Sequence, residues 1–188
     1  MRDGKKAVNV VLTGFMGAGK TAVGRALATA LGLGFLDTDA AIERESGLTI
    51  KDIFANGGEE RFRDIESDII ERLSDNKLGS GLVVSVGGGA VIREVNRKRL
   101  KGFGCMVCLS ASVDETLRRV GSKKNRPLLS QSEAASRETI EALLKEREPV
   151  YQDCDVCIDT TSLTVKEVVE RIKDRLQAVR EGLINSHL

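Results

Sequence analysis

The chain has 188 residues, 30% of them charged, and its 29 basic side chains nearly balance its 28 acidic ones. Proteins that coat nucleic acid or lie on a membrane surface normally carry a basic excess, which this chain lacks. No apolar run reaches the roughly 18 residues of a membrane span. We therefore expect a soluble, cytoplasmic protein that binds neither nucleic acid nor a membrane. The single histidine, His187, is the last residue but one, which disfavours serine–histidine and cysteine–histidine nucleophile systems and histidine-based zinc hydrolases.

Strand-like and helix-like segments alternate along the chain. Strands are predicted where short runs are apolar or β-branched, at 7–13, 35–37, 82–86, 103–109 and 155–158. Helices are predicted at 21–31, at 40–73 with breaks near Gly47 and at Gly57-Gly58, and at 165–180. This alternation predicts an α/β fold, with a doubly wound parallel five-stranded sheet, helices on both of its faces, and one domain spanning residues 1–188.

Two capping boxes and one polar loop add detail to this scheme. Ser112-x-x-Glu115 and Thr164-x-x-Glu167 each follow a predicted strand and are typical of a helix start. The polar run Gly121-Ser-Lys-Lys-Asn125 predicts a mobile loop. We therefore expect a mobile lid at about residues 121–131.

A glycine-rich segment follows the first predicted strand. Gly14-Phe-Met-Gly-Ala-Gly-Lys-Thr21 matches G-x-x-x-x-G-K-[ST], the phosphate loop of ATP-binding proteins. Its glycines let backbone N–H groups close around phosphate oxygens, while Lys20 supplies positive charge and Thr21 a hydroxyl for Mg²⁺. The expected ATP-binding residues of this loop are Gly17, Ala18, Gly19, Lys20, Thr21 and Ala22. A dinucleotide fingerprint also fits, with Asp37 and Asp39 about 20 residues further on, but the Lys-Thr pair favours a nucleoside triphosphate.

Two acids stand at the end of the second predicted strand, at the sheet edge where α/β proteins bind ligands. The third predicted strand ends in Ser85-Val-Gly87 without an acid, so Asp37 is the candidate to hold hydrated Mg²⁺ together with Thr21. Asp39 is then the candidate partner of the hydroxyl that attacks ATP. Alternatively, Asp39 only caps a helix that begins at Ala40.

The four cysteines form two C-x-x-C pairs, Cys105–Cys108 and Cys154–Cys157. A four-thiolate zinc site is one interpretation. The neighbours of both pairs are typical of buried strands, in which residues three apart point to opposite faces, so we expect small core residues instead.

Together, these motifs resemble the shikimate kinase family. The resemblance comprises the phosphate loop and five later segments, in the family's order and spanning roughly residues 8–159: Phe35-Leu-Asp-Thr-Asp39, Glu60-Arg-Phe-Arg-x-x-Glu66, Ser85-Val-Gly-Gly-Gly-Ala-Val91, Asn125-Arg-Pro-Leu-Leu129 and Arg147-Glu-Pro-Val-Tyr151. It implies a P-loop kinase that uses ATP with Mg²⁺ to phosphorylate the 3-hydroxyl of shikimate, giving shikimate 3-phosphate and ADP on the way to chorismate and the aromatic amino acids. It also implies a monomer whose partners are these small molecules.

The resemblance further assigns roles to single residues. It makes Lys20, Asp39 and Arg126 catalytic, with Arg126 on the lid and Arg119 beside the nucleotide. The implied shikimate contacts are Asp39, Arg63, Gly87, Gly88, Gly89 and Arg147. The family often has an arginine or an asparagine-rich turn after the last strand to flank adenine. Residues 160–164 contain no arginine here, so this turn predicts no adenine contact.

The chemistry of these residue types supports the roles, and each residue also has a structural alternative. Arg63 and Arg147 lie in predicted helices, and guanidinium groups bind a carboxylate through two parallel hydrogen bonds. Arg63 could instead pair with Glu59, Glu60 or Glu66 on its own helix, whereas Arg147 has apolar neighbours at that spacing. The three glycines could simply form a tight turn, and Arg126 could be an exposed loop residue.

Two other functions compete with this one. A small kinase of the same type could act on a nucleotide, which would need a base pocket and more phosphate-binding arginines, or on gluconate. A catalytically silent ATP-binding regulator would be expected to lack Lys20, Asp39 or Arg126, and all three are present.

Overall fold

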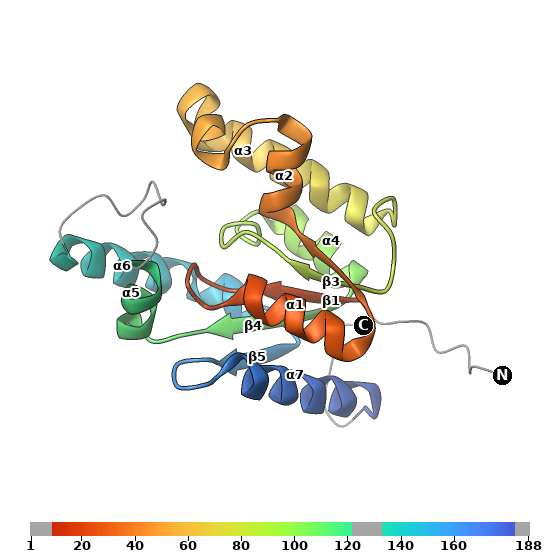
Figure 1. Ribbon diagram of the computed structural model, residues 1–188. Coiled ribbons are helices and arrows are strands. Elements are labelled where there is room, and N and C mark those ends of the chain that lie inside the picture. The colour runs from red at the N-terminus through yellow and green to blue at the C-terminus, as the bar shows by residue number, and fades with distance from the viewer. Residues whose placement is uncertain (1–8, 122–132, 183–188) are drawn as a thin grey trace.

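The computed structural model describes residues 9–121 and 133–182. Its centre is a five-stranded sheet of order β2-β3-β1-β4-β5, in which every pair of neighbours is parallel (Figure 1). The strands are β1 (Val10–Thr13), β2 (Gly34–Asp37), β3 (Leu82–Ser85), β4 (Cys105–Ser110) and β5 (Val156–Asp159). The predicted doubly wound parallel sheet is confirmed, although residues 7 and 8 of the first predicted strand lie outside the described residues.

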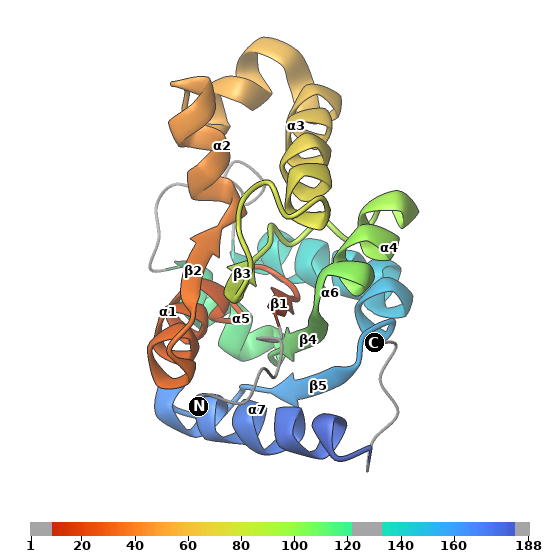
Figure 2. The same cartoon turned by 90° about the vertical axis from the view of Figure 1, so that its right-hand side faces the viewer.

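Helices cover both faces of the sheet (Figure 2). They are α1 (Lys20–Leu31), α2 (Thr38–Ser46), α3 (Ile50–Ser74), α4 (Glu94–Phe103), α5 (Val113–Gly121), α6 (Glu133–Gln152) and α7 (Val165–Arg180). On β1, Val10 and Leu12 pack with α1 and α7, whereas Val11 packs with α3, α4 and α6 on the other face. Among the described residues, no helix combines the length and apolar character that a membrane span requires.

Local signals place several helix ends where they were expected. Gly47 ends α2 in the left-handed conformation, and Gly58, with φ of 70°, kinks α3. Thr164 and Glu167 form both halves of the capping box at α7. At α5 only one half forms: the Glu115 N–H donates to Ser112 Oγ at 3.2 Å, while the Glu115 carboxylate pairs with two arginines. The box predicted at Ser112 is therefore wrong in part, because the arginines bind the Glu115 carboxylate and the Ser112 N–H donates to Thr161 Oγ1 at 2.9 Å.

Helix α4 was not predicted, and the strand expected at 103–109 begins later. Phe103 ends α4, and β4 starts at Cys105. The helix contains few apolar residues, and its N-cap, Arg93, makes no side-chain capping hydrogen bond. The helix buries only Asn96, Leu100 and Phe103, so its stability depends on packing rather than on a local signal.

The expectation for the cysteines is right for one pair and wrong for the other. Cys105 and Cys108 lie on β4 and belong to the cores on opposite faces of the sheet. Cys154 precedes β5, while Cys157 lies within it. The chain bends before the strand begins, so strand alternation does not separate the members of this second pair.

Candidate functional site

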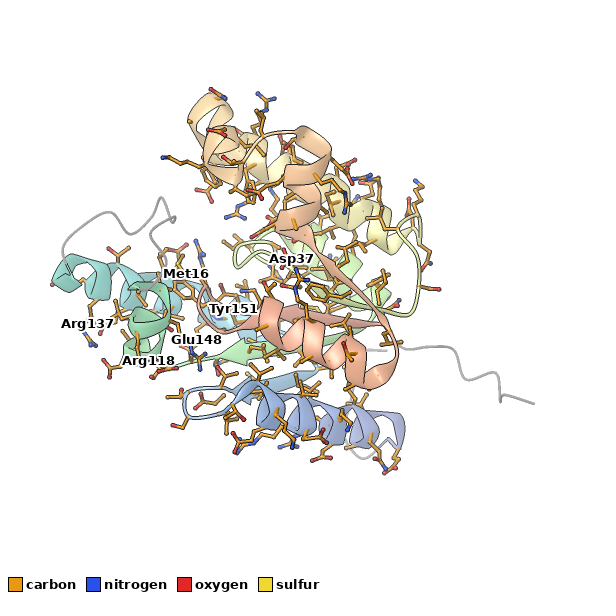
Figure 3. All side chains as sticks on the ribbon, in the orientation of Figure 1. Met16, Asp37, Arg118, Arg137, Glu148 and Tyr151 are labelled. Carbon is orange, nitrogen blue, oxygen red and sulfur yellow. The ribbon has the colours of Figure 1, made fainter. Side chains whose placement is uncertain are left out.

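A cavity of about 800 Å³ opens where the carboxyl ends of β1, β2 and β3 meet helices α3, α5 and α6. Figure 3 labels Met16 and Asp37, which line it from the phosphate loop and from the end of β2. Of the residues proposed from sequence, those lining the cavity are Gly17, Gly19, Lys20, Thr21, Ala22, Asp37, Asp39, Arg63, Gly87, Gly88, Gly89, Arg119 and Arg147. Ala18 is instead buried in the core beside α1, and Arg126 lies outside the described residues, as do residues 122–131 of the predicted lid.

The phosphate loop joins β1 to α1 and is tightly folded. The Lys20 ammonium donates hydrogen bonds to the carbonyl oxygens of Gly14 at 2.7 Å and Phe15 at 3.0 Å. Gly14 has φ of 126°, and a Cβ there would lie 2.0 Å from the carbonyl oxygen of Leu109. Only glycine fits such a position. Lys20 is therefore held over the loop at the N-terminus of α1, where an anion is favoured.

Thr21 and Asp37 bring two oxygens together beside this loop. The Thr21 hydroxyl donates to Asp37 Oδ2 at 2.8 Å. Hydroxyl and carboxylate oxygens suit Mg²⁺, which keeps several waters and usually binds through one or two protein groups plus phosphate. Within residues 9–121 and 133–182, no group of three or more acidic, cysteine or histidine side chains could hold a metal ion. The pair thus fits Mg²⁺ bound with ATP, rather than a metal held by protein alone.

Asp39 is not the cap of the following helix, so that alternative is wrong. Helix α2 begins at Thr38, and its cap is Asp37, whose Oδ1 accepts the N–H groups of Asp39 at 3.1 Å and Ala40 at 3.3 Å. The Asp39 carboxylate lies in the cavity, beside Gly87. The position of its carboxylate in the cavity is compatible with a catalytic role.

The Arg63 side chain, 15% exposed, is held by two acids of its own helix. It donates to Glu59 Oε1 at 3.0 and 3.2 Å and to Glu66 Oε2 at 2.7 Å. Arg63 therefore forms the ion pairs that were the structural alternative to substrate binding, with Glu59 and Glu66. It also lines the cavity. These contacts fix the direction of the guanidinium group.

Glu66 is a buried acid that sequence reasoning included in a motif but did not assign to the site. Its side chain is 0% exposed, and Oε1 has no hydrogen-bond partner among the described residues. Burial raises its pKa to about 6, although Arg63 acts in the opposite direction and the charge of Asp39 adds to the rise. Nothing in its local sequence distinguishes it from exposed glutamates, because burial is a tertiary property.

Arg147 and Tyr151, one turn apart on α6, approach the cavity together. The Tyr151 hydroxyl donates to the carbonyl oxygen of Gly88 at 2.6 Å and also hydrogen-bonds with Arg147. Burial raises the pKa of Tyr151 to about 12, so it remains a donor at neutral pH. Arg147 forms no ion pair with the described residues, and its Nε is buried without a hydrogen-bond partner there. A buried donor of this kind is costly unless a ligand satisfies it.

The loop after β3 carries the three glycines past these side chains. The Gly87 N–H donates to Thr38 Oγ1 at 3.2 Å, so this amide is not an open donor for a ligand. Gly88 lies against the phosphate loop, and a Cβ on Gly89 would lie 2.2 Å from Arg63 Nη2. The glycines therefore allow the loop to approach Arg63 and the phosphate loop closely.

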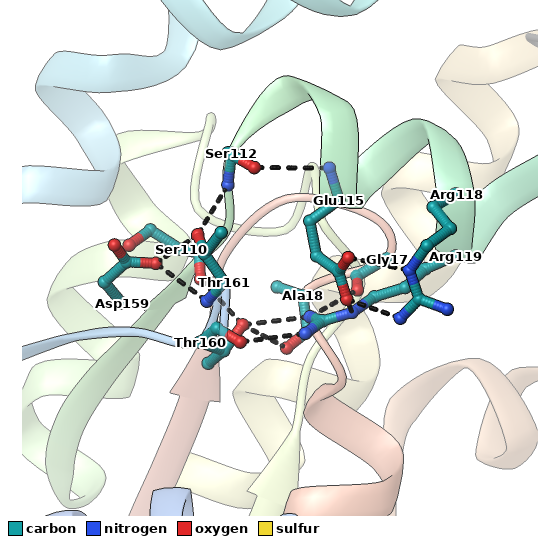
Figure 4. A network of polar contacts seen from close by, with 10 residues as sticks. All are labelled: Gly17, Ala18, Ser110, Ser112, Glu115, Arg118, Arg119, Asp159, Thr160 and Thr161. Carbon is teal, nitrogen blue, oxygen red and sulfur yellow. Dashed lines mark hydrogen bonds and ion pairs between the residues drawn. The ribbon is translucent and has the colours of Figure 1, made fainter. Parts of the chain in front are cut away.

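Arg119 connects three segments at the nucleotide side of the cavity (Figure 4). Its guanidinium donates to Glu115 on α5 at 2.6 Å, to the Gly17 carbonyl at 3.2 Å, and to the Thr160 carbonyl at 2.8 Å and hydroxyl at 2.9 Å. Arg118, which was not predicted, also lines the cavity and pairs with Glu115. The turn after β5 thus supports the phosphate loop through Arg119.

An apolar wall completes the cavity and was also missed. Phe54 and Phe62 on α3 stack with ring centroids 4.9 Å apart, and both line the cavity with Ile50. Their spacing on the helix is equally typical of ordinary core residues, so the sequence contains no signal that separates the two roles.

Comparisons with known proteins all point to one family. A family model described as shikimate kinase matches residues 16–177. A shikimate kinase of Thermodesulfovibrio yellowstonii is 43% identical over 174 residues, which cover 93% of this chain and 98% of that protein. One of Pelotomaculum thermopropionicum is 46% identical over 164 residues, covering 87% and 92%. The solved structure of shikimate kinase from Acinetobacter baumannii in complex with shikimate has a TM-score of 0.85 at 38% identity and covers 91% of this chain and 93% of that one.

Proposed function

The chain belongs to the shikimate kinase family, and we propose that the phosphate loop, Asp39 and two arginines act together in the cavity to transfer phosphate from ATP to shikimate. The activity, ATP-dependent phosphorylation of shikimate in the biosynthesis of aromatic amino acids, follows from the family. We propose which residue acts at each step, and that the 3-hydroxyl of shikimate accepts the phosphate. The two substrates would then meet between the phosphate loop and α6.

The observation that carries this proposal is the unpartnered Nε of Arg147 in a cavity that Arg63 also lines. Both guanidinium groups line the same cavity, and Nε of Arg147 is buried without a partner among the described residues. A carboxylate such as that of shikimate would satisfy it through charge-assisted hydrogen bonds. Of the charged side chains lining the cavity, five are basic and three are acidic, which favours an anionic substrate and ATP.

The chain's own groups supply most of the chemistry. Backbone amides of the phosphate loop and Lys20 would bind and neutralise the phosphates of ATP, and Arg119 would hold that loop in place. Asp39 would accept a hydrogen bond, and then the proton, from the attacking hydroxyl. Mg²⁺ bound with ATP at Thr21 and Asp37 would supply charge neutralisation. The family resemblance implies that Arg126 also binds the phosphates of ATP.

The competing functions fit the cavity less well. The walls that face away from the phosphate loop combine the two arginines with one apolar patch, which suits a compact acid better than a second nucleotide. Gluconate is also a small acid, so a coupled ADP-release assay should compare shikimate with gluconate and nucleoside monophosphates. We expect turnover with shikimate only.

We also propose that the chain works as one domain and as a monomer in the cytoplasm. Among the described residues, those of a single chain bring both arginines, Asp39 and the phosphate loop to one cavity, which supports the single domain and the monomer. Size-exclusion chromatography with light scattering tests the monomer. A specific activity that rises with protein concentration would contradict it.

Paired variants test the assignment of residues. Asp39→Asn keeps the shape of the side chain but removes its charge, so kcat should fall by about 10²-fold or more while ATP still binds. Asp68→Asn, on the exposed face of α3 with a side chain 70% exposed, is the matched control and should leave kcat unchanged. Wild-type kcat in Asp39→Asn would remove Asp39 from the reaction.

Arg147→Lys keeps the charge but loses the geometry that matches a carboxylate. We expect the KM for shikimate to rise about tenfold, which corresponds to roughly 1.4 kcal/mol, with little change in the KM for ATP. Arg137→Lys lies on the same helix, where its partners are Asp114 and Glu141, and should change neither constant. An unchanged KM for shikimate in Arg147→Lys would place the carboxylate elsewhere.

A further inference from the structure

Three of the four cysteines gather at one edge of the sheet, and none of them lines the cavity described above. β5 is an edge strand beside β4 (Figure 2). The two strands pair in parallel, in a register that places Cys108 directly opposite Cys157. Side chains of directly paired residues point to the same face of a sheet. Cys154 lies before β5, packs against the same core as Cys108, and has its Sγ 3.3 Å from the carbonyl oxygen of Val156. The three thiols therefore converge.

These thiols differ in their contact with solvent. Cys108 is buried, Cys154 is partly buried and Cys157 is exposed. Cys105, the fourth cysteine, is buried in the core on the opposite face. An oxidant in solution thus reaches Cys157 first, and Cys105 serves as an internal reference.

The thiols are also unequal in acidity. Hydrogen bonds from Cys108 and Cys154 lower the pKa of Cys157 because they stabilise its thiolate, although burial and the charge of Asp159 act in the opposite direction. The corresponding contacts, together with burial, raise the pKa of Cys108, which acts as a donor. Because the thiolate is the nucleophile, Cys157 is both the accessible and the reactive member of the cluster.

We propose that Cys157 is a site of reversible oxidation, at which a hydroperoxide forms a sulfenic acid and Cys154 then closes a disulfide. First, the Cys157 thiolate attacks one peroxide oxygen, the O–O bond breaks, and hydroxide leaves and takes up a proton to form water. Next, the Cys154 sulfur attacks the Cys157 sulfur, the S–O bond breaks, and the departing hydroxide leaves as water with the proton of the Cys154 thiol. Two thiols are oxidised and one hydrogen peroxide is reduced to two waters.

Cys154 is a better second thiol than Cys108. Cys108 and Cys157 are both held in the β4–β5 ladder, and Cys108 is 2% exposed. Cys154 precedes the ladder, so its sulfur can approach Cys157 without breaking strand pairing, and its proton can reach water. The disulfide would therefore link the two cysteines of one C-x-x-C pair.

Peptide mapping of the full-length protein distinguishes these pairings. Trypsin places Cys105 and Cys108 in the peptide 102–118, and Cys154 and Cys157 in the peptide 148–166. The protein is treated with hydrogen peroxide, unfolded, alkylated, digested and analysed by mass spectrometry, with and without dithiothreitol. We expect peptide 148–166 to lose two hydrogens and to resist alkylation, and dithiothreitol to reverse both changes. Cys105 and Cys108 should remain fully alkylated.

Two variants separate the steps. Cys157→Ser should leave Cys154 reduced under the same treatment. Cys154→Ser should stop at the sulfenic acid, which dimedone captures on Cys157. A peptide 148–166 that stays reduced, or a cross-link between the two peptides, would overturn the proposal. So would one zinc per chain by elemental analysis, because bound zinc would occupy the thiolates. None of these readouts measures kinase activity, so failure here is distinct from failure of the proposed function.

Discussion

Gly87→Ala tests how closely the loop after β3 is fitted against the acids of the cavity. A Cβ at this position would lie 2.5 Å from Glu66 Oε1 and 3.0 Å from Asp39 Oδ1, well inside normal packing distances. Gly87 is not among the glycines with positive φ, so the methyl group itself is the perturbation. Overpacking of this kind costs about 1–3 kcal/mol. At about 2–4 °C per kcal/mol for a chain of this size, Tm should fall by roughly 2–12 °C.

The substitution should change kinetic constants that depend on shikimate but not the KM for ATP. Displacing the Asp39 carboxylate should lower kcat and raise the KM for shikimate, while the KM for ATP changes little. Gly102→Ala is the matched control, because a Cβ there meets nothing within 4 Å. In the last turn of α4 it should stabilise the protein by up to about 0.5–1 kcal/mol. Thermal unfolding by circular dichroism and coupled ADP-release kinetics measure both variants. Parent-like Tm and kcat in Gly87→Ala would refute the described packing.

Three further predictions address single contacts. Lys20→Ala removes the charge held over the phosphate loop, so turnover should be abolished in the same kinetic assay, and near-normal turnover would contradict the ATP site. Arg63→Lys loses the guanidinium contacts to Glu59 and buried Glu66, so Tm should fall. The KM for shikimate should also rise about tenfold. An unchanged KM would leave Arg63 with a structural role alone. Burial raises the pKa of Glu66 from 4.5 to about 6, so the folded state disfavours its charged form and stability is lost as pH rises through this window. Urea unfolding should therefore show the parent losing about 2 kcal/mol relative to Glu66→Gln between about pH 3.5 and 7, most of it between pH 4.5 and 6. Parallel curves for the two proteins would show that Glu66 is not buried as described.

Local sequence signals determined much of the secondary structure and the chemistry of the phosphate loop. The spacing of Gly14, Gly19, Lys20 and Thr21 is sufficient to predict a phosphate loop between a strand and a helix, because such a loop forms from consecutive residues. The bounds of α7 were predicted correctly for the same reason, since its capping box lies within four residues of chain. Such features depend on backbone conformation and nearest neighbours only.

Contacts between distant segments decided the rest of the fold. The two capping boxes have the same spacing, yet one is complete and the other half-formed, because the Ser112 N–H donates to Thr161 Oγ1 in the turn after β5 instead of to Glu115. Helix α4 has no side-chain cap and depends on burial against the sheet. Cys108 lies opposite Cys157 because β4 pairs with β5. The order of strands and helices along the chain does not specify which strands pair.

The site shows the same division between sequence and tertiary structure. Its motifs predicted Asp39, Arg63 and Arg147, and the position of Asp39 just beyond the carboxyl end of β2 is where α/β proteins bind ligands. Only the tertiary structure showed that Asp37 is the cap of α2, that Glu66 is buried beside Arg63, and that Arg147 Nε has no partner among the described residues. Burial and hydrogen-bond satisfaction depend on all the elements that pack around a side chain, so they emerge when the chain folds rather than from the spacing of its residues.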